Sequence, residues 1–179
     1  PVDGKLIAND ATWQYFDGGS PASDWYKAAS VSGWKSGAAM LGYPAGGGIA
    51  TTIDNRAVVY FRNSFTVSDP AAFSALQARV SADDGAIVYI NGVEAFRSPN
   101  LSKGSNLPYT DGYACTSATI EATLDPSLLK AGENLVAVEV HNCTSGSSDI
   151  EFAMQLDGSG DGVVLPPDPG TTPTAEPTI

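Results

Sequence analysis

The sequence predicts an all-β fold: an antiparallel β-sandwich of the jelly-roll type, with only short helical turns. Three observations support this prediction. Apolar and polar residues alternate with a period of two, glycine and proline number 19 and 12, and charged residues make up only 16% of the 179. Such alternation is typical of strands with one buried face, and abundant turn formers separate short strands. With 42% hydrophobic residues, the chain can also form a buried core.

Several segments carry the alternation clearly. Strands are expected at residues 59–67, 76–82, 118–124, 136–140 and 150–156. Residues 86–90 are apolar on both faces and run into Asn91-Gly92, the dipeptide that most strongly favours a tight hairpin turn. Residues 93–96 should therefore return as the partner strand. Around eight strands joined by long connections indicate two packed antiparallel sheets.

The connections and the C-terminal end contain turn and linker signals. Asp-Pro pairs at residues 69–70 and 125–126 each favour a short helical turn, and Gly132 is expected to close the second one. From residue 163 onward the sequence is rich in proline and threonine, as in extended interdomain linkers. We therefore expect a β-sandwich domain over 1–162 and a linker or tail over 163–179, either free or docked against a neighbour.

The charge balance limits the possible partners. The net charge is −11, from 20 acidic and 9 basic residues. A chain of this charge repels a phosphate backbone, so it is not expected to bind nucleic acid, and the same repulsion disfavours an anionic membrane surface. No apolar run approaches the roughly 20 residues that a membrane helix requires. The chain is expected to be soluble.

The two cysteines, Cys115 and Cys143, suggest an oxidising compartment. An even number of cysteines in a chain rich in glycine, threonine and serine predicts one disulfide, and hence a secreted or cell-surface protein. The alternative is a pair of buried, unpaired thiols. A two-cysteine zinc site is disfavoured because zinc usually needs four ligands and the chain has a single histidine, His141.

Short motifs that occur in a fixed order over residues 5–157 are similar to a known family. They are Trp13-x-Tyr15-x-Asp17-Gly18, Trp34-Lys35-Ser36-Gly37, Leu41-Gly42-Tyr43, Tyr60-Phe61-Arg62-x-Ser64-Phe65, Asp83-Asp84-Gly85-Ala86-Ile87-Val88-Tyr89-Ile90-Asn91-Gly92 and Ala131-Gly132-Glu133-Asn134-Leu135-Val136-Ala137-Val138-Glu139-Val140. Together they resemble the galactose-binding-like jelly-roll modules of secreted bacterial hydrolases and surface proteins. The resemblance implies the fold strongly and the ligand poorly. In one departure, Val31-Ser32-Gly33 stands where relatives often carry acidic residues, which weakens the expectation of an acidic function there.

Aromatic residues in loop-like settings are the candidates for carbohydrate binding. Sugar recognition uses flat aromatic faces against the apolar faces of a pyranose, with a few directed polar groups. Trp25 and Tyr26 lie in a polar, turn-rich stretch, Tyr43 precedes a glycine-rich loop, and Tyr109 and Tyr113 flank a turn. The alternative for the tryptophans is that they are core residues, since large aromatic side chains dominate small β cores.

Asp83 and Asp84 are the candidate metal ligands. Oxygen-rich turns of this kind can bind calcium, and a similar Asp-Asp pair binds calcium and sugar in the protective-antigen-like lectin modules, which are a separate family. Asp149 and Glu151 are weaker candidates on the same chemical grounds. The alternative for the pair is structural: the carboxylates cap a tight turn through hydrogen bonds.

The sequence lacks a recognisable catalytic constellation. His141 has no partner motif of the Gly-x-Ser-x-Gly type, and no pair of carboxylates stands out for glycoside cleavage. We expect a non-catalytic extracellular module that binds a polysaccharide or glycan and tethers an attached enzyme or surface protein to it. The alternative is an assembly module that packs against a neighbouring domain of the same polypeptide, or self-associates in a surface fibre, without a sugar ligand.

Overall fold

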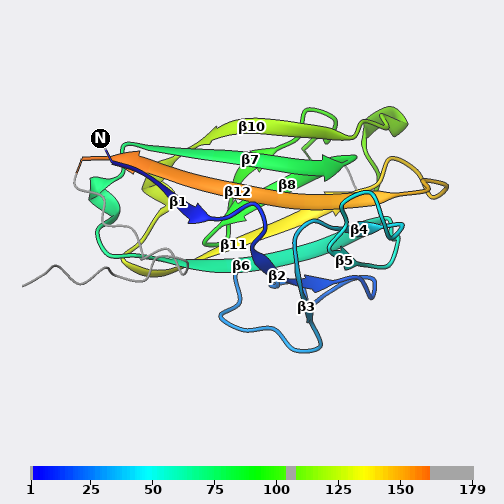
Figure 1. Cartoon of the computed structure of the whole chain (residues 1–179), viewed down its shortest axis with the longest axis horizontal. Coiled ribbons are helices and arrows are strands. Elements are labelled where there is room, and N and C mark those ends of the chain that lie inside the picture. Colours follow the sequence, from blue (N-terminus) through cyan, green and yellow to red (C-terminus); the bar gives the residue numbers. More distant parts are fainter. Residues whose placement is uncertain (1, 104–107, 162–179) are drawn as a thin grey trace, which may run out of the picture.

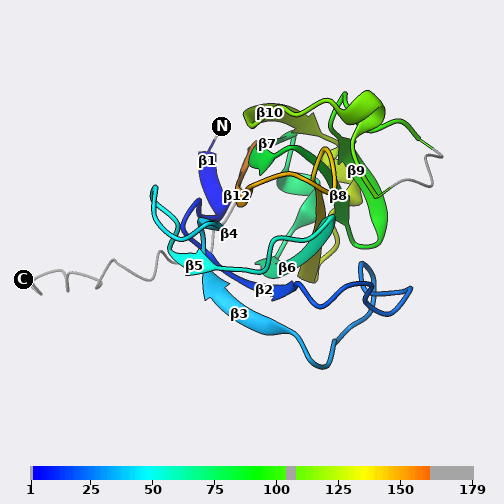
Figure 2. The same ribbon diagram turned by 90° about the vertical axis from the view of Figure 1, so that its right-hand side faces the viewer.

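The structure is a computed structural model of the chain, and it describes residues 2–103 and 108–161. These residues form two sheets that pack face to face, as Figure 1 shows and as the end-on view in Figure 2 makes clear. The predicted all-β sandwich is thus confirmed. The linker predicted over residues 163–179 lies outside the described residues.

The first sheet, sheet A, has the strand order β10-β7-β12-β4-β5, and β1 also pairs with β12. Its strands are β1 (Val2–Ile7), β4 (Leu41–Tyr43), β5 (Thr51–Thr52), β7 (Ala75–Asp83), β10 (Ala118–Leu124) and β12 (Ile150–Gly160). Neighbours are antiparallel except for β4 and β5, which are parallel. The long strand β12 is the centre of this sheet, because β1, β4 and β7 all pair with it.

The second sheet, sheet B, has the order β3-β2-β6-β11-β8-β9, with antiparallel neighbours throughout. Its strands are β2 (Thr12–Phe16), β3 (Lys35–Ala38), β6 (Val58–Val67), β8 (Gly85–Ile90), β9 (Val93–Arg97) and β11 (Gly132–His141). The predicted hairpin joins β8 to β9. Asn91 and Gly92 both have a positive φ, 50° and 83°, which is the backbone that a tight two-residue hairpin turn requires.

The helical segments among the described residues are single 3-10 turns. They are η1 (Pro70–Ala72), η2 (Asp111–Tyr113) and η3 (Pro126–Leu128). The two predicted turns begin as expected, because the Asp69 and Asp125 side chains accept hydrogen bonds from the backbone of the turns that follow. The prediction for Gly132 is wrong: η3 ends at Leu128, and Gly132 begins β11 instead. Within the described part of the chain, no helix is long and apolar enough to cross a membrane.

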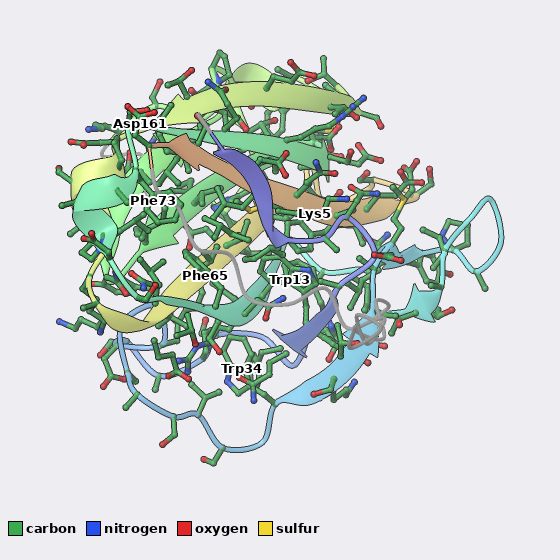
Figure 3. All side chains as sticks on the ribbon, turned by 60° about the vertical axis from the view of Figure 1, so that its left-hand side comes forward. Lys5, Trp13, Trp34, Phe65, Phe73 and Asp161 are labelled. Carbon is green, nitrogen blue, oxygen red and sulfur yellow. A yellow bond between two sulfur atoms is a disulfide. The ribbon has the colours of Figure 1, made fainter. Side chains whose placement is uncertain are left out.

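The core lies between the two sheets and is centred on aromatic side chains. The Phe152 ring of sheet A meets the Trp13 ring edge to face at 4.9 Å between centroids, and it stacks on the Phe61 ring at 4.2 Å. All three side chains are fully buried, and Figure 3 shows Trp13 between the layers. Since Trp13 and Phe61 belong to sheet B, these contacts join the two sheets directly.

We expect Phe152→Ala to lower the free energy of unfolding by about 3–5 kcal/mol, because it removes both ring contacts and leaves a cavity between the sheets. Val93→Ala is the control, since Val93 is 53% exposed and its truncation should change stability by no more than about 0.5 kcal/mol. Urea unfolding followed by tryptophan fluorescence measures both. Equal stability of the two variants would contradict this account of the core.

Candidate functional site

The strand pairings bring residues that are far apart in the sequence to one end of the sandwich. Tyr43 pairs with Ile150, Asp83 with Glu151, and Gly85 with His141. The described loop segments at this end are 44–50, 53–57, 98–103, 108–117 and 142–149, and they adjoin the ends of β4, β5, β6, β9, β10, β11 and β12 (Figure 1). We call this region the disulfide end. It holds three of the five aromatic residues predicted to bind sugar and both predicted metal ligands.

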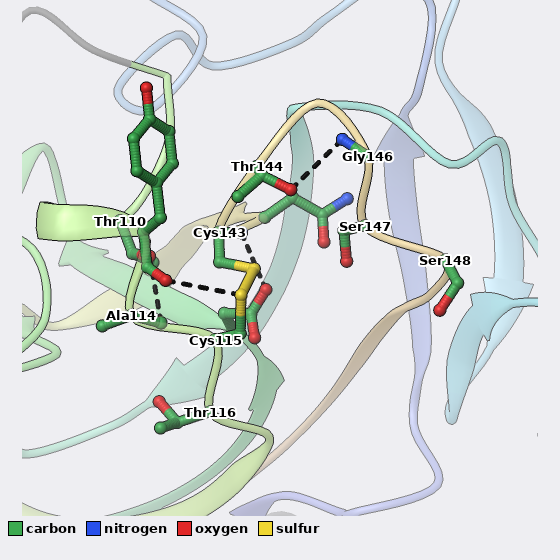
Figure 4. Close-up of a disulfide and its surroundings, with 12 residues drawn as sticks. Thr110, Ala114, Cys115, Thr116, Cys143, Thr144, Gly146, Ser147 and Ser148 are labelled. Carbon is green, nitrogen blue, oxygen red and sulfur yellow. Dashed lines mark hydrogen bonds between the residues drawn. A yellow bond between two sulfur atoms is a disulfide. The ribbon is translucent and has the colours of Figure 1, made fainter.

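The predicted disulfide is confirmed between Cys115 and Cys143, whose Cα atoms lie 4.9 Å apart. It fastens the segment before β10 to the segment after β11 (Figure 4). Hydrogen bonds support the same junction: the Thr110 amide donates to the Asn142 carbonyl, and the Thr110 hydroxyl donates to the Ala114 carbonyl. The loop that carries Tyr109 and Tyr113 is therefore held against β11.

The role of His141 is visible at this junction. It is 9% exposed, and its Nδ1 lies 2.8 Å from the Pro108 carbonyl oxygen. Its Nε2 lies 3.4 Å from a carboxylate oxygen of Glu139. The histidine thus links the loop at residue 108 to β11.

We expect the double variant Cys115→Ala/Cys143→Ala to lose about 2–4 kcal/mol of stability, because the unfolded chain is no longer closed into a loop. Thermal unfolding measured by circular dichroism checks this. Wild-type protein unfolded with a reducing agent should match the double variant. An unchanged melting temperature in both would contradict a structural role for the bridge.

Asp83 and Asp84 are almost fully buried, each with 5% of its surface exposed. One carboxylate oxygen of Asp84 accepts a hydrogen bond from the Cys143 amide at 2.7 Å, and the Asp84 amide donates to the His141 carbonyl. Asp84 therefore fixes the chain just after β11, next to the disulfide. This structural use differs from the local turn cap that the sequence suggested as the alternative to metal binding, because the bond joins residues 59 positions apart.

Asp83 lies in a cluster of carboxyl groups. Burial is the main cause that raises its pKa to about 8, and the neighbouring Asp84 and Asp149 raise it further. The oxygen donors are of the class that calcium prefers, although calcium takes six to eight of them. Among the described residues, the group of three potential ligands with mutually close atoms is Asp84, Cys115 and Cys143, and both sulfur atoms are in the disulfide. Calcium binding at Asp83 and Asp84 stays a prediction.

The raised pKa of Asp83 predicts a pH dependence of stability. Between pH values of about 4 and 8 the folded chain keeps a proton that the unfolded chain has released, so stability falls as the pH rises through this range. Asp83→Asn should remove this dependence and be more stable than the wild type above about pH 8, by about 1 kcal/mol or more.

Urea unfolding at several pH values measures the stability of the wild type and of Asp83→Asn. If the stabilities of the two proteins change with pH in parallel, the raised pKa does not belong to Asp83. Glu121→Gln on exposed β10 is the control for loss of one carboxylate. Calcium added above about pH 8 should stabilise the wild type and not Asp83→Asn if the carboxylates bind the ion.

The predicted sugar-binding residues differ in how accessible their rings are. Tyr113 and Tyr43 are 62% and 41% exposed. Tyr109 and Tyr26 are half-buried, whereas Trp25 is only 6% exposed. At the disulfide end, Tyr43 and Tyr113 thus present the most accessible aromatic surfaces of the five candidates.

Trp25 and Tyr26 lie elsewhere, in a segment that covers the outer face of sheet B. The Trp25 ring contacts those of Tyr60 and Tyr89 at 5.0 and 6.0 Å, and it stacks on Trp34 at 6.1 Å. The Tyr26 ring lies 5.0 Å from that of Tyr89. These contacts form a second aromatic layer on the side of sheet B away from the core, where Figure 3 shows Trp34.

A cavity that the sequence did not predict lies beside this aromatic layer. Its volume is about 420 Å³, and it lies between residues 27–29 and the outer face of sheet B. Lys27, Arg62 and Lys130 line it together with Glu133. The alternation placed Arg62 on the polar face of its strand, but no local signal indicated that segment 17–34 folds over that face.

Comparison with known proteins identifies the fold but no family. No protein-family model matches the chain, and no curated protein matches it. Among solved structures, a β-glucuronidase from Bacteroides uniformis matches 88% of this chain with a TM-score of 0.59 and 14% identity. A glycosyl hydrolase family 2 member from Bacteroides cellulosilyticus matches 88% with a TM-score of 0.56 and 15% identity. A Faecalibacterium prausnitzii β-glucuronidase matches 89% with a TM-score of 0.56 and 14% identity.

The chain spans only a fraction of these larger proteins, namely 18%, 21% and 31% of their lengths. At such low identity the similarity establishes a shared β-sandwich fold and nothing about chemistry. The match is nonetheless to one part of a longer chain in each case. The sandwich described here therefore has the architecture of a domain found within glycosidases.

Proposed function

We propose that this chain is a non-catalytic accessory domain that binds a glycan and tethers an attached extracellular enzyme or surface protein to it. The observation that carries the proposal is the match of nearly the whole chain to a fraction of several glycosidases. A domain of this kind needs an accessible surface for sugar rings. Exposed tyrosines on the loops of the disulfide end are suited to that contact.

The construction of the disulfide end supports the same proposal. Binding sites on β-sandwiches are commonly formed by loops that a rigid scaffold positions. Here the disulfide and the hydrogen bonds of Thr110 hold the Tyr113 loop in place, which lowers the entropy lost when a ligand binds. The disulfide also supports a secreted or cell-surface location.

A structural role is the second candidate. In the similar solved structures the matching part belongs to a longer chain, which is also what a domain that packs against its neighbours would require. Val93, 53% exposed at the tip of the β8–β9 hairpin, is an apolar side chain available for such a contact. This role predicts concentration-dependent self-association that is lost when residues 163–179 are deleted.

For the glycan-binding role, we expect saturable binding of the whole chain to one class of glycan, measured on a broad polysaccharide panel with calcium and with chelator. Tyr113→Ala and Tyr43→Ala should each weaken binding about five- to tenfold, because each removes an exposed ring that stacks on sugar. Tyr109→Ala tests whether the half-buried ring of Tyr109, on the same loop as Tyr113, also contributes to binding. Val93→Ala is the matched control, as it removes an exposed apolar side chain at the opposite end of the sandwich.

Binding that is unchanged in all three tyrosine variants would exclude the disulfide end as the sugar site. Failure of the folded wild type to bind any glycan, in either condition, would leave the structural role as the better account. Sedimentation of the intact chain at several concentrations then tests that role directly.

A further inference from the structure

The cavity on the outer face of sheet B is built differently from the disulfide end. Its floor is formed by strands, including Gln14 of β2 and Arg62 of β6, and residues 27–29 form one wall. The Arg62 Nη2 donates a hydrogen bond to the Ala28 carbonyl, which holds that wall over the sheet. With a volume of about 420 Å³, the cavity is within the range of small-molecule sites.

Arg62 is the unusual group in this cavity. Only 3% of it is exposed, and its Nε and Nη1 are buried with no hydrogen-bond partner among the described residues. A buried cation with unpaired donors is costly unless an anion or another acceptor satisfies it. Asp24 and Glu133 act on its charge from a distance, but neither forms an ion pair with it among the contacts of the described residues.

Positive charge gathers here in an otherwise acidic chain. Three of the 9 Lys and Arg residues line the cavity: Lys27, Arg62 and Lys130. Four of the others pair with carboxylates, namely Lys35, Arg56, Arg97 and Lys103. The cavity cations have no such partner within the described ranges, and Glu133 is the one acidic residue in the lining. The cavity is therefore locally cationic although the net charge is −11.

We propose that this cavity binds a carboxylate-bearing sugar, that is, a hexuronate unit of a glycan, with the carboxylate at Arg62 and the lysines around it. Amide and hydroxyl side chains of the lining, among them Gln14, Ser36 and Ser64, are of the type that hydrogen-bonds sugar hydroxyls. A guanidinium suits a planar carboxylate better than a spherical ion. The inference rests on the proposed glycan-binding function, and it adds a ligand class and a second place of binding.

The overall negative charge does not oppose this assignment for a short ligand. At physiological ionic strength charges farther than about 8 Å from the ligand are largely screened, so the three cations of the cavity and Glu133 decide the local field. Binding that depends on them should weaken with added salt.

The test is calorimetric titration of the whole chain with short oligogalacturonates and oligoglucuronates, and with neutral galactose and glucose oligosaccharides of the same length. We expect a uronate to bind and the neutral oligosaccharides to bind at least tenfold more weakly. Arg62→Lys, which keeps the charge and loses the planar fork, should weaken uronate binding about tenfold. Lys27→Ala and Lys130→Ala should each weaken it about threefold.

Arg79→Ala is the matched control, because Arg79 is an exposed cation on β7 of the opposite sheet and its loss should leave binding unchanged. If Arg62→Lys does not fold, the exposed Lys27 and Lys130 variants still decide the question. The proposal is overturned if the folded wild type binds no uronate, if the Lys27 and Lys130 variants bind as well as the wild type, or if dextran sulfate binds equally well.

The tyrosine variants separate this proposal from the broader one. Neutral glycan binding that is lost in Tyr113→Ala, without uronate binding, would overturn the cavity assignment and leave the proposed function intact. Uronate binding that requires Lys27 and Lys130 but not Tyr113 would establish the cavity as a place of binding separate from the tyrosine surface.

Discussion

The contact of Phe152 with Trp13 and Phe61 is the constraint on which the rest of the structure depends. It fixes sheet A against sheet B, since the first ring belongs to one sheet and the other two to its partner. A one-residue slip in β12 would turn Phe152 away from this contact and expose the whole inward row of that strand. With β12 in place, its pairing partners β4 and β7 end beside β8 and β11, and their loops meet at the disulfide end.

The longer strands could be predicted because each carries its own signal. β6, β7 and β12 have 10, 9 and 11 residues, enough for alternation to separate a buried face from an exposed one. β4 and β5 have only 3 and 2 residues, and they form a parallel pair that a loop connects. Segments of that length show no period, so their place in the sheet is decided by tertiary pairing and not by local pattern.

The candidate site likewise has features that follow from the local sequence and features that depend on tertiary packing. Counting cysteines was sufficient for the disulfide, because the chain has two and they form one bridge. Burial of Trp25 was the alternative to sugar binding that the sequence allowed, and Trp25 is 6% exposed. Burial of Arg62 was not predictable, because it depends on a segment that folds over its sheet face from elsewhere in the sequence. The Arg62 hydrogen bond to Ala28 joins residues 34 positions apart. The alternation of residues 59–67 is consistent with an outward-facing Arg62, but it could not tell whether solvent or protein covers that face.

The net charge of −11 therefore does not describe the local electrostatics of this sandwich. At the disulfide end, burial and the neighbouring carboxyl groups raise the pKa of Asp83 to about 8. The outer face of sheet B holds cations without carboxylate partners in the described part of the chain. The disulfide end and the outer face of sheet B are formed by different strands. Acidic and basic residues that are interspersed in the sequence are therefore separated in the folded structure. Because screening limits each field to its own surroundings, an acidic chain can present a cationic cavity to an anionic sugar.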